Sequence, residues 1–277
     1  MQNYFTKAAL NGGDSGGAKL RVLDLFSGIG GFSLGLERTG GFETVAFCEI
    51  EPFPRKVLAK HWPKVPIYDD VRTLNKTVLD RDGIAVDVIT GGFPCQDIST
   101  AGNQAGLDEG TRSGLWSEIT RLVGELRPKF IIVENVAALL AGPSEQPGGW
   151  FGRILGDLAS CGYDAEWENI PASALGAPHR RERVWLLAYP EQGGWGFLQQ
   201  PSADKLRSHR TAWTSNARST NLANWDGEQI CPPDFVRMVD GLRSKLDGLR
   251  FAALGNAVVP QIPELIGHAI LQSMEKA

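Results

Sequence analysis

The sequence predicts an α/β fold of the doubly wound, Rossmann-like kind. Apolar runs of strand length alternate with stretches of helical periodicity along most of the chain. A glycine-rich turn, Ser27 to Gly31, joins the first strand to the first helix, and an acidic residue, Glu49, ends the second strand. These three features are typical of folds that bind a nucleotide at the carboxyl edge of a sheet.

The elements can be assigned from periodicity and from turn residues. Strands are expected over residues 20–26, 43–48, 66–71, 86–90, 130–133, 163–170 and 184–188. Helices are expected over residues 32–38, 53–61, 115–126, 150–161 and 263–274. The last helix is apolar and long enough to pack against the first part of the chain.

Composition is that of an ordinary soluble protein, with 277 residues, 42% hydrophobic and 22% charged. No apolar run approaches the roughly 20 residues that span a bilayer, and no signal-peptide core is present near residue 1, so a cytoplasmic location is expected. Four cysteines without a Cys-x-x-Cys pair suggest neither a zinc cluster nor a disulfide framework. The net charge of −4 gives no global sign of nucleic-acid binding, which depends on local patches.

The glycine turn and two carboxylates indicate a cofactor site. Gly28 lets the backbone approach a ligand closely, and Glu49, 21 residues later, can accept hydrogen bonds from ribose hydroxyls. A tight turn with a solvated carboxylate is the alternative. Asp70, at a third strand end, could accept a bond from an adenine amino group or could cap a helix.

A cysteine follows the apolar strand at residues 86–90. Gly91, Gly92 and Pro94 place Cys95 on a tight turn, where a thiol is accessible and can act as a nucleophile. The alternative is a small apolar core residue. The polar segment 99–114 that follows is interpreted as a mobile loop.

Charged residues flank two further apolar strands. Glu134 follows four apolar residues, so it either lies at a strand tip in a cleft or is strongly desolvated, and both cases favour a raised pKa. The alternative is an exposed strand-end carboxylate. Arg181 and Arg183 share one face of a strand. They could grip an acceptor-rich or anionic group, or form a solvated basic edge that discourages sheet pairing.

Domain organisation follows from shifts in composition. Residues 1–18 are interpreted as a flexible lead, 19–189 with 250–277 as the catalytic and cofactor-binding domain, and 190–249 as a small, irregular second domain. In the second domain, basic residues interleaved with asparagine and tryptophan suit phosphate contacts and base readout, or form a solvated loop. These basic residues are Lys205, Arg207, Arg210 and Arg218.

Together, the motifs resemble the ordered motif set of the DNA cytosine-5 methyltransferases of bacterial and phage type. The matching segments are Asp24 to Phe32, Glu49, Asp70-Val71, Gly92 to Gln96, Glu134 to Val136, Arg181 to Arg183 and Gly255 to Pro260. The resemblance covers roughly residues 20–188 and 250–277. It implies a sheet that binds S-adenosylmethionine, and a target-recognition domain over 190–249.

The resemblance also implies residue roles. Cys95 would attack carbon 6 of a cytosine flipped out of duplex DNA, Glu134 would hold a proton at ring nitrogen 3, and Arg183 and Arg181 would contact the base or a phosphate. Asn135 would order the Glu134 loop. The implied cofactor contacts are Phe26, Ser27, Gly28, Gly30, Gly31, Glu49, Ile50, Asp70, Val71, Pro94, Leu115 and Asn256. The implied DNA contacts are Gln96, Ser99 and the four basic residues of the second domain.

Departures from the family pattern limit some of these implications. His179 stands where glutamine is usual, Ile50 replaces an aromatic residue, and the recognition segment is short. A tRNA cytosine-5 methyltransferase is one alternative, but the Cys-Phe-Thr signature of that branch is replaced here by Cys231-Pro-Pro. A DNA-binding module without catalysis is another. The expected partners are double-stranded DNA and a separately acting restriction endonuclease, with a monomeric chain and no membrane.

Overall fold

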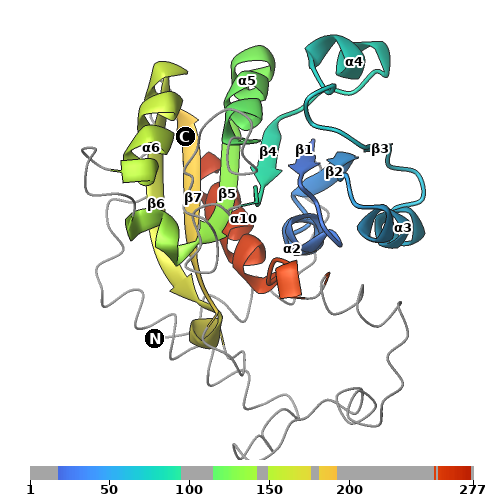
Figure 1. Cartoon of the computed structure of the whole chain (residues 1–277). Coiled ribbons are helices and arrows are strands. Elements are labelled where there is room, and N and C mark those ends of the chain that lie inside the picture. Colours follow the sequence, from blue (N-terminus) through green and yellow to red (C-terminus); the bar gives the residue numbers. More distant parts are fainter. Residues whose placement is uncertain are drawn as a thin grey trace, which may run out of the picture.

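A computed structural model describes residues 18–94, 115–141, 149–175, 181–191, 253 and 255–275. Its centre is one seven-stranded sheet of order β3-β2-β1-β4-β5-β7-β6 (Figure 1). The strands are β1 Leu20–Leu25, β2 Phe42–Cys48, β3 Ile67–Tyr68, β4 Val88–Gly91, β5 Phe130–Val136, β6 Tyr163–Pro171 and β7 Glu182–Pro190. The helices are α2 Gly31–Arg38, α3 Pro52–His61, α4 Lys76–Arg81, α5 Trp116–Leu126, α6 Gly149–Ser160 and α10 Gln261–Met274, with 3-10 turns at Ala137–Ala141 and Ala172–Leu175.

The sheet combines parallel and antiparallel pairing. Strands β1 to β5 pair in parallel, so their carboxyl ends meet at one edge, whereas β7 runs antiparallel to both β5 and β6. The strand order reverses direction between β1 and β4, which is the point where open α/β sheets bind ligands. The expectation of an α/β, Rossmann-like sheet is therefore confirmed.

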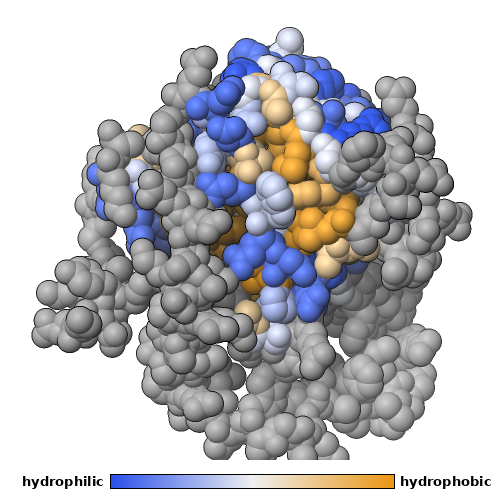
Figure 2. Space-filling model, turned by 90° about the vertical axis from the view of Figure 1, so that its left-hand side faces the viewer, coloured by the Kyte–Doolittle hydropathy of each residue, from blue (hydrophilic) through white to orange (hydrophobic). Residues whose placement is uncertain are grey.

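Helices cover both faces of the sheet because buried side chains alternate along each strand. On one face, Leu23, Ile89 and Ile131 pack in a core with residues of α5 and α6. On the other face, Val22 and Val88 pack with residues of α2 and α10. Figure 2 shows the side of the molecule that carries α6 and β6, where apolar surface is visible between hydrophilic residues.

Two glycines of α2 allow the C-terminal segment to lie directly on that helix. A Cβ on Gly31 would come 2.5 Å from the Val258 carbonyl oxygen, and one on Gly35 would overlap the Pro260 carbonyl oxygen. Glu264 of α10 adds an ion pair with Arg38, with 3.5 Å between Nη1 and Oε2. The predicted C-terminal helix thus packs against the first helix after the glycine turn.

Three assignments from the sequence need correction. The third strand spans Ile67–Tyr68 and ends before Asp70, and the short helix α4 was not anticipated. Strand β5 continues through Glu134 and Asn135 to Val136, because these residues pair with β7. Among the described residues, no helix is long and apolar enough to cross a membrane.

Candidate functional site

The glycine turn after β1 has a backbone that few residues other than glycine can adopt. Gly28 and Gly30 have φ values of +53° and +87°, and Phe26 also has a positive φ of +52°. Ser27 fixes the turn, since its Oγ donates to the carbonyl oxygens of Asp24 at 2.5 Å and Cys48 at 3.2 Å. The turn is thereby held at the carboxyl ends of β1 and β2.

Space is open above Gly28 and filled behind Gly30. A Cβ on Gly28 would meet no atom within 4 Å, whereas one on Gly30 would lie 2.7 Å from the Trp62 ring. Trp62 is held in turn by Glu37, which accepts from its Nε1 at 2.9 Å. The turn therefore rests on an aromatic support and leaves open space beside Gly28, where a ligand could approach the backbone closely.

Glu49 lies beside this turn with its carboxylate buried. Its Oε2 accepts from Gly28 N at 2.7 Å and its Oε1 from Glu51 N at 2.8 Å. Burial raises the pKa of Glu49, and the two backbone N–H groups offset part of the rise. The next side chain, Ile50, is 59% exposed and offers an apolar surface at the same edge.

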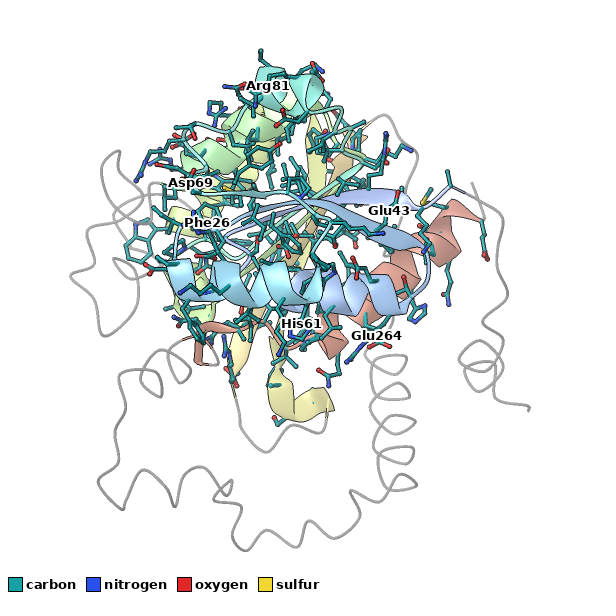
Figure 3. All side chains as sticks on the ribbon, turned by 90° about the vertical axis from the view of Figure 1, so that its right-hand side faces the viewer. Phe26, Glu43, His61, Asp69, Arg81 and Glu264 are labelled. Carbon is teal, nitrogen blue, oxygen red and sulfur yellow. The ribbon has the colours of Figure 1, made fainter. Side chains whose placement is uncertain are left out.

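The loop after β3 brings Asp70 and Val71 to this edge. Asp70 Oδ1 accepts from Arg72 N at 2.9 Å, which closes a tight turn in the loop. The N-cap of the following helix α4 is Asn75, so the helix-cap alternative for Asp70 is wrong. Val71 is 5% exposed and packs into the core. Figure 3 shows Phe26 and Asp69 at one edge of the sheet and Glu43 at the opposite edge.

A buried carboxylate that the sequence analysis left without a role joins three elements beneath the site. Asp24 is fully buried in β1 and accepts from Ser33 Oγ of α2 and from Thr90 Oγ1 of β4, each at 2.8 Å. Burial raises the pKa of Asp24 to about 7, although both hydroxyls act against the rise. Like Glu134, Asp24 is a charged residue next to an apolar run, and this pattern marks both residues in the sequence.

Glu134 is buried within β5, so the exposed strand-end alternative is excluded. The residue is 9% exposed and lies opposite Trp185 of β7. Burial raises the pKa of Glu134, while the charges of Arg183 and Arg181 act in the opposite direction. The predicted raised pKa is therefore borne out, for a carboxyl group inside a strand rather than beyond it.

The two predicted arginines lie close to Glu134. Arg183 Nε is 3.1 Å from Glu134 Oε1, and Arg183 also donates to its neighbour's carbonyl oxygen, Glu182 O, at 2.8 Å. Arg181 precedes β7, and its Nη1 donates to Gly255 O at 2.6 Å, next to Asn256. The arginines thus link the Glu134 strand to the C-terminal segment, and a merely solvated basic edge is excluded.

Asn135 connects this strand to the turn that leads to Cys95. Its Nδ2 donates to Phe93 O at 3.3 Å, and its Oδ1 accepts from Val136 N at 2.8 Å. Gly92 leaves room for the Glu134 carboxylate, since a Cβ there would lie 3.3 Å from Oε2. Asn135 therefore contacts the 92–94 segment. The expectation that it orders a loop at Glu134 is wrong, because Glu134 lies within β5.

Several predicted site residues lie outside the described part of the chain. These are Cys95, Gln96, Ser99, Lys205, Arg207, Arg210 and Arg218. Pro94 and Leu115 are described, half-buried, on either side of the gap, and Asn256 is exposed. Within the described ranges, no group of three or more potential ligands could hold a metal ion.

The arrangement at the glycine turn could hold a nucleoside-bearing ligand. The cradle at Gly28 is open, Glu49 supplies a buried carboxylate beside it, and Ile50 supplies an exposed apolar side chain. The second group of residues, around Glu134, is suited to proton exchange and to binding an acceptor-rich ring. Asp24 joins β1, the strand before the glycine turn, to α2 and β4.

Comparison with protein families gives a match over most of the chain. The sequence model of the family described as C-5 cytosine-specific DNA methylase matches residues 20–228. The match includes the glycine turn, the Cys95 turn and the Glu134 strand.

Individual relatives agree with the family match. The type II methyltransferase M2.BsuMI of Bacillus subtilis is 38% identical over 173 residues, which are 61% of this chain and 42% of that protein. M.Sau3AI of Staphylococcus aureus is 33% identical over 203 residues, 69% of this chain and 48% of that protein. The chain thus spans less than half the length of these curated relatives.

Solved structures share the fold. A DNA modification methyltransferase encoded within a prophage of E. coli is 30% identical with a TM-score of 0.52, covering 62% of this chain and 47% of that one. The DNMT2 of Spodoptera frugiperda is 22% identical with a TM-score of 0.54, covering 66% and 54%, and supports the fold alone.

Proposed function

Because the chain belongs to the C-5 cytosine-specific DNA methylase family, we propose that it transfers a methyl group from S-adenosylmethionine to carbon 5 of cytosine in double-stranded DNA. The observation that carries the proposal is the environment of Glu134. A buried carboxyl group with a raised pKa touches an arginine and lies against the turn that precedes a cysteine. Such a group can hold a proton for a base while the thiol attacks it.

The residues around the glycine turn would hold the cofactor. The backbone of Gly28 and Gly30 would approach it, Glu49 would accept from the ribose hydroxyls, and Ile50 would pack against the adenine ring. Asp70 would accept from the adenine amino group. The other expected contacts are Phe26, Ser27, Gly31, Val71, Pro94, Leu115 and Asn256. When bound, S-adenosylmethionine supplies an electrophilic methyl group that carbon 5 of the base accepts.

Cys95 would form the covalent bond to the substrate. Its sulfur attacks carbon 6 of the cytosine, and the electron pair of the 5,6 double bond moves toward carbon 5. Glu134, protonated, keeps negative charge from accumulating by holding a proton at ring nitrogen 3. After methylation a base removes the carbon 5 proton, and the carbon–sulfur bond breaks to release Cys95.

Arg183 has to change partner when the substrate enters. In the structure it contacts the Glu134 carboxylate, and in the complex it would contact the base carbonyl or a nearby phosphate. Loss of that ion pair favours the protonated form of Glu134, which is the form required at ring nitrogen 3. Base binding and proton uptake are thereby coupled.

Base flipping and target reading are assigned to segments outside the described residues. The cytosine must leave the duplex stack, at a cost of a few kcal/mol. Gln96 and Ser99 would contact the DNA near the flipped base, and Lys205, Arg207, Arg210 and Arg218 would contact phosphates and base edges. A monomer in the cytoplasm, with a restriction endonuclease acting separately, completes the proposal.

Trapping of the covalent intermediate tests the proposal. Duplex DNA containing 5-fluorocytosine should form a stable adduct with the wild-type chain in the presence of cofactor. Fluorine replaces the proton at carbon 5 that a base must remove before the bond to Cys95 can break. The Cys95→Ala variant should form none. Absence of the wild-type adduct with a library of duplex sequences would refute the mechanism.

A second experiment distinguishes DNA from RNA as the substrate. Labelled cofactor should transfer its methyl group to duplex DNA and not to tRNA. Transfer to tRNA alone would overturn the substrate assignment while leaving the chemistry intact. Cofactor and DNA binding without adduct or methyl transfer would identify a binding module.

A further inference from the structure

We infer that Arg121 of α5 is a positioning residue for cofactor binding, which fixes the Asp70-Val71 loop at the distance from α5 that the adenine subsite requires. The inference rests on the cofactor assignment proposed above. Its basis is a set of contacts around one guanidinium group that joins two segments expected to touch the cofactor.

Arg121 uses all three nitrogens of its guanidinium group. Nη2 donates to the carbonyl oxygens of Val71 at 3.0 Å and Leu74 at 2.8 Å. Nε donates to Glu118 Oε2 and Nη1 to Glu125 Oε1, each at 2.8 Å. The two carboxylates, one turn before and one turn after Arg121, therefore orient the fork toward the loop.

Glu125 strengthens the same junction from its other oxygen. Its Oε2 accepts from Lys76 N at 2.9 Å, at the first residue of α4. The loop from Val71 to Lys76 is thus bound to α5 at three backbone positions, two through Arg121 and one through Glu125. The side chains of Val71 and Leu74 are buried beside α5, so the loop is held by packing as well.

The contacts of Arg121 and Glu125 with the Val71–Lys76 loop, called the clamp below, have a geometric consequence for the ligand site. Asp70 immediately precedes the first clamped carbonyl group, and its carboxylate is turned by the bond to Arg72 N. Leu115 immediately precedes α5, the helix that carries Arg121. Arg121 therefore makes two of the three backbone contacts that fix the Asp70-Val71 loop relative to α5, and small displacements of groups that position a ligand have large effects.

Replacement of Arg121 by methionine tests the inference by direct binding. Calorimetry with S-adenosylhomocysteine, which needs no turnover, should give a Kd for Arg121→Met roughly tenfold or more above wild type. The rate of methyl transfer at saturating cofactor should stay within about threefold. Hydrogen exchange should accelerate for the amides of residues 70–76 and remain unchanged in β1.

Arg21→Met is the matched control for loss of stability. Arg21 also pairs with a carboxylate, Asp87, at 2.7 Å, but at the opposite edge of the sheet. The Arg21→Met substitution should lower the melting temperature and change the Kd by no more than about twofold.

The outcomes separate this inference from the proposed function. Failure of the wild-type chain to bind S-adenosylhomocysteine would refute the cofactor assignment. Wild-type binding together with an unchanged Kd for Arg121→Met would refute the role of Arg121. If Arg121→Met does not fold, Arg121→Lys, which can reach one carbonyl group at a time, should give an intermediate Kd, and an unchanged value would again refute the role.

Discussion

Two carboxylates at opposite edges of the sheet, Asp87 and Glu49, are equally buried at 7% exposure, yet their pKa values are shifted in opposite directions. Asp87 lies at the amino end of β4 and is paired with Arg21 at 2.7 Å and Lys129 at 3.2 Å. These partners hold the pKa of Asp87 at about 2. Glu49, at the carboxyl edge, receives two backbone N–H groups, and burial raises its pKa.

The difference distinguishes a charge pairing that stabilises the fold from carboxyl groups whose charged forms are disfavoured. At the amino edge, the buried charge is neutralised by partners within the chain, and it contributes to stability. At the carboxyl edge, the pKa values of Asp24, Glu49 and Glu134 are all raised, so their charged forms are disfavoured in the folded chain. Carboxyl groups with shifted pKa values cluster at functional sites, which agrees with the proposed function.

Substitution of Glu134 by glutamine should give the largest effect at the carboxyl edge. We expect methyl transfer to fall by about 10²- to 10⁴-fold, because the amide cannot exchange a proton with ring nitrogen 3. Stability should not fall at pH 8, because the raised pKa of Glu134 means that its favourable contribution exists at low pH and is lost as pH rises through the folded-state value. Wild-type turnover by the variant would remove Glu134 from the mechanism.

Asp24 allows the carboxyl edge to be tested by stability. Asp24→Ala should lower the free energy of unfolding by about 2–4 kcal/mol, since two buried hydroxyl groups lose their acceptor. Asp24→Asn should be tolerated. Its stability relative to wild type should increase as pH rises from about 4 to about 7, because the wild-type carboxyl group has to ionise in the core over this range. Urea unfolding of the three proteins at pH 5 and pH 8 measures both effects. A pH-independent difference between Asn and wild type would contradict the raised pKa.

Asp87 should show the opposite pH dependence. Asp87→Asn should lower stability at pH 7 by about 1–2 kcal/mol, a value reduced by the exposure of Arg21 and Lys129 to solvent. The wild-type advantage should disappear as pH falls from about 4 to about 2, because the lowered pKa confers stability above the unfolded value. Acid titration followed by circular dichroism measures this loss. Cofactor affinity should not change, and a changed affinity would show that the two edges are not independent.

Lys129 should give the smallest effect. Its side chain is 59% exposed, so Lys129→Met should cost at most about 0.5 kcal/mol, even less in 0.5 M salt. Thermal melting at low and high salt measures the difference. A cost above that of Asp87→Asn would show that Lys129, rather than Arg21, carries the amino-edge pairing.

Local sequence signals predicted most of the fold and part of the site. Alternation of apolar runs and helical periods placed the strands and helices, and the charge after four apolar residues identified Glu134. The extension of β5 to Val136 could not be predicted, since it depends on pairing with β7, which lies far along the chain. Periodicity carries no information about such a distant partner.

Two residues of the site depend on contacts that no local pattern reveals. Asp24 finds its partners at Ser33 and Thr90, on a helix and on another strand. In the sequence, Arg121 is a polar position of an amphipathic helix. Its partners, the carbonyl oxygens of Val71 and Leu74, are brought to it by the tertiary fold, which no local pattern encodes. The roles of Cys95 and of the basic residues between 205 and 218 stay predictions, because these residues lie outside the described ranges.

The glycine face of α2 has a consequence for the order in which the protein is made. Val258 and Pro260, which cover Gly31 and Gly35, leave the ribosome long after the glycine turn and every strand of the sheet. During synthesis α2 is therefore a segment whose packing partner does not yet exist, and the glycine turn before it can form while that face of α2 is still uncovered. Completion of the site would thus be a late event of biosynthesis, timed by the emergence of the residues that cover α2.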